Sequence, residues 1–177
     1  MAVMGAFIMA SGCKKGVDNP PEDGAHNAIT TFTIKFSEAG APAYEAIFED
    51  ADGPGGAPPL RFDEIVLQAG KTYQASITLT NKMVSPYEDM TVEVRDAGSE
   101  HQFFFLPKTS TTLNIAYNDT DKNGLPVGLE TVWQTPVTGL NDTIKINLRH
   151  IPYGKTAGNP PSVGSSDLNI DFPLKIQ

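Results

Sequence analysis

Cysteine and long apolar segments are what this 177-residue chain lacks most clearly. Its one cysteine, Cys13, has no partner for a disulfide within the chain. The apolar run at residues 2–10 is far shorter than the roughly 20 residues that a membrane-spanning helix needs. Basic residues are also few, since 13 Lys and Arg face 21 Asp and Glu for a net charge of −8. This acidic balance argues against nucleic acid as a partner and against electrostatic attachment to an anionic membrane.

The common catalytic signatures are missing as well. The sequence contains no Gly-x-Ser-x-Gly elbow, no His-Glu-x-x-His pair, no P-loop and no dinucleotide-binding fingerprint. Its only thiol stands near the N-terminus, and its carboxylates fall in predicted turns, so no acid–base pair can be nominated. We therefore expect a protein that is not an enzyme.

The N-terminal residues resemble an export signal. The apolar run leads into Ala10-Ser11-Gly12-Cys13, which is similar to the lipobox of bacterial lipoproteins, where small residues precede the cysteine that receives the lipid. No Lys or Arg precedes the run, unlike an ordinary signal peptide, which is consistent either with a start codon upstream or with a trimmed sequence; a buried strand with an incidental cysteine is the alternative. We predict a signal peptide at 1–12, a lipidated cysteine and flexible tether at 13–27, and a folded domain at 28–177. Lys14, in place of an aspartate, favours the outer membrane.

Beyond the tether, apolar residues recur at every second position, which is typical of strands with one buried face. Clear alternation predicts strands at 31–36, 72–79, 90–94, 113–117, 144–148 and 168–176, and further strands are expected near 43–48, 61–67, 101–106 and 129–134. Pro173 suggests an edge position for the last strand. Gly- and Pro-rich turns separate these segments. The pattern predicts an all-β fold, an antiparallel β-sandwich of immunoglobulin-like type, with a small β-barrel as the alternative.

One loop matches the calcium-binding pattern of EF-hands. Calcium takes six to eight oxygen ligands, which this spacing could supply from side chains and one backbone carbonyl. The flanks are strand-like rather than helical, and Pro126 removes a backbone N–H, so a structural hairpin loop with Asx-turns is the competing interpretation. The candidate calcium ligands are Asp119, Asp121, Asn123, Leu125 and Glu130, with Gly124 at the turn. No cofactor is otherwise expected.

Two weaker candidates remain. Asp50 and Asp52 lie in a glycine-rich turn and could ligate a cation. Among the three histidines, His26 falls in the tether, whereas His101 and His150 are in phase with apolar residues and should lie on the buried side near strand ends. A zinc or haem site that these two share is one hypothesis, and hydrogen-bonded structural histidines are the other.

Several segments together resemble a family of small lipoproteins of the Bacteroidetes type. They are residues 48–56, 100–104, 121–129, 148–152 and 167–172. Such lipoproteins are often encoded beside TonB-dependent outer-membrane receptors, so the resemblance implies a part in nutrient uptake but supplies no catalytic residues.

The expected function is thus that of a non-enzymatic lipoprotein of the cell envelope. A lipid would anchor it to the outer membrane, on the periplasmic or the surface face, where it would cooperate with a TonB-dependent receptor or bind a small nutrient ligand. A calcium-stabilised structural or adhesion domain is one alternative, and a metal or haem scavenger that uses His101 and His150 is another.

Overall fold

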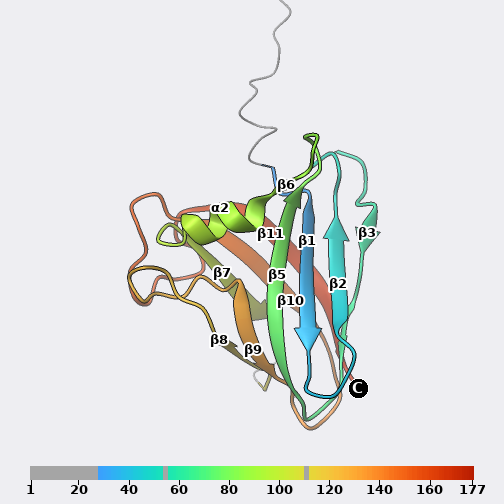
Figure 1. Ribbon diagram of the computed structural model, residues 1–177. Helices are drawn as coiled ribbons and strands as arrows, with labels where there is room; N and C mark the ends of the chain where they lie inside the picture. The colour runs from blue at the N-terminus through green and yellow to red at the C-terminus, as the bar shows by residue number, and fades with distance from the viewer. Residues whose placement is uncertain (1–27, 54–55, 110–111) are drawn as a thin grey trace, which may run out of the picture.

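The computed structural model describes residues 28–53, 56–109 and 112–177. These residues form two stacked β-sheets with one short helix at one end (Figure 1). The predicted signal peptide, the lipidation site at Cys13 and the tether with His26 lie outside the described residues. In the described part of the chain, no helix is long and apolar enough to cross a membrane.

The first sheet has seven strands. Its order is β3 (Arg61–Phe62), β2 (Tyr44–Glu49), β1 (Thr31–Ser37), β5 (Thr72–Asn81), β9 (Glu130–Gln134) and β8 (Asn114–Tyr117), and β6 (Glu88–Asp89) also pairs with β5. All of these pairings are antiparallel.

The second sheet has four strands. Its order is β4 (Ile65–Leu67), β11 (Ser165–Ile176), β10 (Leu140–His150) and β7 (His101–Pro107). Only the β4–β11 pairing is parallel. Neither sheet closes on itself within the described residues, so the prediction of a β-sandwich is confirmed and the barrel alternative is not.

The core lies between the two sheets and follows the alternation of the sequence. Strand β5 alternates strictly, with every second side chain from Tyr73 to Leu79 buried. Phe32 from the first sheet packs against Phe172 from the second, with ring centroids 5.6 Å apart. Trp133 is fully buried, and its indole N–H donates to the Thr131 hydroxyl at 2.8 Å. Burial of such side chains is the main stabilising term of a sandwich.

The strand predicted at 90–94 is wrong, because these residues form helix α2 (Met90–Asp96). The Asp89 carboxylate caps the helix by accepting the Thr91 backbone N–H at 2.9 Å. Met90 and Val94 are four residues apart and both buried, whereas Val92 between them is 47% exposed. The same apolar spacing therefore serves a one-sided short helix, which alternation alone cannot distinguish from a strand.

Two further strand predictions need correction. Residues 61–67 form two strands in different sheets, because the chain crosses between the layers at Asp63, whose carboxylate accepts the Ile47 N–H at 2.9 Å. Strand β11 is interior rather than an edge. It tolerates Pro173 because the neighbouring strand β4 pairs only from Leu174 onward.

Candidate metal centre

His101 and His150 are direct neighbours across strands β7 and β10. The antiparallel register pairs the two residues, and their imidazole rings stack with centroids 4.9 Å apart and an interplanar angle of 10°. His101 is buried and His150 is partly exposed. The sequence predicts that each lies on the inner side of a strand end, and the register adds that the two ends coincide.

A β-bulge brings Asp167 to the same place. Leu148 pairs with Leu168 but Arg149 pairs with Ser166, so Asp167 is the extra residue on strand β11. Strict alternation would direct Asp167 away from the face that Leu168 buries. The bulge instead places its Oδ2 atom 3.4 Å from Nε2 of His101. The sequence analysis missed Asp167, because no pattern in the sequence marks the bulge.

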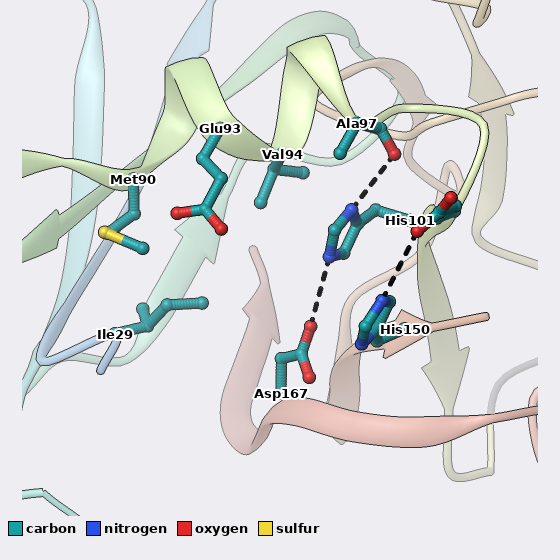
Figure 2. A pocket seen from close by; sticks show the side chains of 9 residues that line it. Ile29, Met90, Glu93, Val94, Ala97, His101, His150 and Asp167 are labelled. Atoms are coloured by element: carbon teal, nitrogen blue, oxygen red, sulfur yellow. Dashed lines mark hydrogen bonds and ion pairs between the residues drawn. The ribbon is translucent and has the colours of Figure 1, made fainter. Parts of the chain in front are cut away.

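These three residues share a pocket of about 290 Å³ beneath helix α2 (Figure 2). Glu93 extends from the helix toward the pocket. The remaining walls of the pocket are largely apolar side chains and backbone. The complete lining is Ile29, Met90, Glu93, Val94, Ala97, Glu100, His101, His150 and Asp167. Three carboxylates and two imidazoles thus meet with no Lys or Arg in the lining, which favours a bound cation.

Backbone hydrogen bonding fixes the orientation of His101. Its Nδ1 atom lies 3.1 Å from the Ala97 carbonyl oxygen, which can only accept, so Nδ1 carries the proton and Nε2 faces Asp167. Burial lowers the pKa of His101, but Asp167, the Ala97 carbonyl and Glu93 outweigh it, and the pKa is raised. An imidazole held by a carbonyl on one nitrogen, with the other directed into a pocket, is the usual arrangement of a metal-binding histidine.

The donor atoms are close enough for one ion to join them. In the part of the chain that the structure describes, His101, His150 and Asp167 form the single group of three potential ligands, with donor atoms within 4.8 Å of one another. Tetrahedral zinc holds its ligand atoms about 3.3 Å apart, so binding would shorten the widest donor separation by at most roughly 1.5 Å. Nε2 of His101 and Oδ2 of Asp167 are already 3.4 Å apart. Glu100 lies 3.6 Å from Nε2 of His150 and can orient that ring.

The EF-hand-like loop is held by its own hydrogen bonds. Both carboxylate oxygens of Asp119 accept backbone N–H groups, from Gly128 at 2.7 Å and from Leu129 at 2.8 Å. Oδ1 of Asp121 accepts the N–H groups of Asn123 and Leu125 at 2.8 and 3.0 Å. These are the Asx-type contacts of a structural loop, which favours that interpretation over a calcium site.

A buried lysine supplies a positive charge to this loop. The Lys155 side chain is fully buried, with Nζ 3.3 Å from Oδ2 of Asp121 and donating to the Pro126 carbonyl at 2.5 Å. Burial raises the pKa of Asp121, but the loop N–H groups and Lys155 reverse that effect and lower it. Glu130, the last of the candidate calcium ligands, is an exposed residue of strand β9.

The Asp50–Asp52 pair is bound within its own turn. Burial and the neighbouring Asp52 carboxylate both raise the pKa of Asp50. Oδ2 of Asp52 also accepts the Ala57 N–H at 2.8 Å. The pair belongs to no group of three potential ligands among the described residues.

Comparison of the chain with protein-family models, curated proteins and solved structures finds no match. A function must therefore be argued from the chemistry of the site itself.

Proposed function

We propose that this chain is a non-enzymatic lipoprotein of the cell envelope whose domain binds one divalent transition-metal ion, zinc above all. His101, His150 and Asp167 would be the ligands. The observation that carries the proposal is the meeting of two paired histidines and a bulged aspartate in one acidic pocket.

The donor set selects the kind of metal. Two imidazole nitrogens and one carboxylate oxygen suit zinc and its transition-metal neighbours, whereas calcium requires six to eight oxygen ligands. The stacked rings of His101 and His150 also argue against haem held between two histidines, because such ligands must lie on opposite faces of the porphyrin.

Binding rather than catalysis is the better use of this pocket. No Ser, Thr, Cys or Lys side chain lines it, so it offers no hydroxyl, thiol or amine nucleophile for a covalent step. Three protein ligands leave a fourth position open on the ion, which a water molecule or a partner's ligand can fill. A carrier that passes its metal to another protein benefits from such an open position.

The location of this carrier rests on the N-terminal pattern. A lipid on Cys13 would hold the domain at the outer membrane, and the family resemblance suggests a TonB-dependent receptor as its partner. A metal-binding accessory protein beside an uptake receptor joins the envelope role with the chemistry of the pocket.

The direct test is a calorimetric titration of the metal-free full-length chain with zinc. We expect one ion per chain in the wild type and loss of that binding in His101→Ala and His150→Ala. The matched control is Tyr153→Ala, which removes a fully exposed ring near the site's strand end. Wild-type protein that takes up no zinc, or histidine variants that bind as the wild type does, would refute the proposal.

A further inference from the structure

Two uncharged loops lie exposed at one end of the sandwich. Residues 57–60 read Ala-Pro-Pro-Leu and residues 83–87 read Met-Val-Ser-Pro-Tyr, without a single Asp, Glu, Lys or Arg. Leu60 is 72% exposed, Tyr87 is 67% exposed and Met83 is 47% exposed. A cluster of exposed apolar side chains on an otherwise acidic domain indicates a contact surface.

A set of contacts through Lys82 holds these loops side by side. Its Nζ atom lies 2.7 Å from Oε1 of Glu49 and 5.9 Å from the centre of the Tyr87 ring. The Leu60 N–H in turn donates to the Glu49 carbonyl at 2.8 Å. The Lys82 N–H donates to the hydroxyl of Thr30, which stands at the start of the described domain. The two loops therefore flank the end at which the chain enters the domain (Figure 1).

We propose that these two loops, centred on Leu60, Met83 and Tyr87, dock on the surface of a lipid bilayer. The inference rests on the proposed lipid anchor at Cys13. Ala28 lies fifteen positions after Cys13, so even a fully extended chain between them spans at most about 50 Å. A lipid on Cys13 would therefore be joined to the domain at the end that carries Ala28, which is also the end that carries both loops.

The contact must be apolar rather than electrostatic. Two cationic side chains lie beside the loops, and each forms an ion pair. Lys82 pairs with Glu49, and Arg61 pairs with Asp63. The acidic Glu88 follows directly after the second loop, and the net charge of −8 would further oppose anionic headgroups. Tyrosine, by contrast, is favoured at bilayer interfaces, where its ring is buried and its hydroxyl stays hydrated. Docking should therefore occur on neutral lipid.

Tryptophan quenching tests the docking independently of natural lipidation. Since Cys13 is the single cysteine, a maleimide phospholipid can attach the full-length chain to phosphatidylcholine vesicles whose acyl chains carry bromine. Tyr87→Trp reports on the docking loop. Val137→Trp is the matched control, because Val137 is 85% exposed and follows the end of β9, which pairs with the start of β5, at the end of the sandwich away from the two loops. The native Trp133 is fully buried and provides a constant background.

We expect brominated lipid to quench the added emission of the Tyr87→Trp variant about twofold and to leave the Val137→Trp and wild-type proteins unchanged. Adding Leu60→Ser and Met83→Ser to Tyr87→Trp should relieve most of the quenching. A Tyr87→Trp variant that is quenched no more than the control would overturn the proposal and would favour a protein as the partner of these loops. Because the lipid is attached chemically, that result would leave the question of natural lipidation untouched.

Discussion

His101 and His150 form a cross-strand pair with stacked imidazole rings 4.9 Å apart, and Asp167 closes the group from the next strand. In the absence of metal, a proton on Nε2 of His101 would pair this ring with the Asp167 carboxylate. A metal ion at the same position would satisfy the Asp167 carboxylate and both imidazoles, so proton and metal compete for the site.

Asp167→Asn should weaken zinc binding about 10–100-fold, because the amide replaces an anionic ligand with a neutral one. The matched control is Asp171→Asn on the same strand, whose carboxylate pairs with Lys145 on the exposed side. Zinc competition against a chromogenic chelator measures both affinities. Equal affinities for the two variants would show that Asp167 is not a ligand.

The pKa of His101 is raised, which fixes the sign of a pH effect. The protonated His101–Asp167 pair stabilises the metal-free fold fully below the unfolded pKa of about 6.5, and this contribution is lost as pH rises through the folded pKa. The difference in unfolding free energy between wild type and Asp167→Asn should therefore be larger at about pH 5.5 than at about pH 8.5. Urea unfolding at both values checks this, and a difference that grows with pH would contradict it.

Zinc affinity should change with pH in the opposite direction to the stability of the metal-free fold. Since the ion needs a deprotonated His101, binding should strengthen as pH rises through the raised pKa of that residue. Titrations across this range measure the trend. Affinity that is independent of pH would mean that His101 does not give up a proton to the metal.

Lys155→Met should destabilise the fold by about 3–5 kcal/mol, because it leaves the Asp121 carboxylate buried without its counter-charge. Lys145→Met, which removes a largely exposed lysine, should change the stability by less than about 0.5 kcal/mol. Chemical denaturation compares the two. If Lys155→Met lowers the unfolding free energy no more than Lys145→Met does, the Lys155 ammonium does not stabilise the loop.

Calcium should leave the melting midpoint of the wild type unchanged, with or without EDTA. The carboxylates of Asp119 and Asp121 already accept backbone N–H groups, and Lys155 supplies the positive charge. Thermal melts test this. A midpoint that rises with calcium and falls with EDTA would restore the calcium interpretation of residues 119–130.

Gly164→Ala should cost more than about 2 kcal/mol and weaken zinc binding, because its φ of +62° is strained for alanine and its added Cβ would overlap the His150 carbonyl oxygen. Gly158→Ala in the same loop has a φ of +79° but open space, so it should cost about 1 kcal/mol and spare the zinc site. Denaturation and titration of both variants separate backbone strain from damage to the site.

Sequence periodicity predicted the sandwich because the long strands β1, β5 and β11 each bury one face, as β5 illustrates from Tyr73 to Leu79. It also placed His101 and His150 on inner positions at strand ends. It could not reveal that these ends coincide, because that depends on the register between β7 and β10.

Three local features could not be predicted from the sequence. Helix α2 is a seven-residue helix whose spacing imitates a strand, and the bulge at Asp167 leaves no compositional mark. Lys155 reaches Asp121 from a loop more than thirty residues away in the chain, a tertiary contact that a loop motif alone cannot indicate. The sequence showed the carboxylates of residues 119–130, but it could not show that Lys155, a residue outside this loop, supplies the positive charge that pairs with Asp121.

Anomalous scattering at the zinc absorption edge, from crystals grown with zinc, tests the central claim most directly. We predict one strong peak about 2.0–2.2 Å from ligand atoms of His101, His150 and Asp167. Crystals in which this pocket shows no peak, or in which zinc lies instead in the loop at residues 119–130, would contradict the proposed metal site.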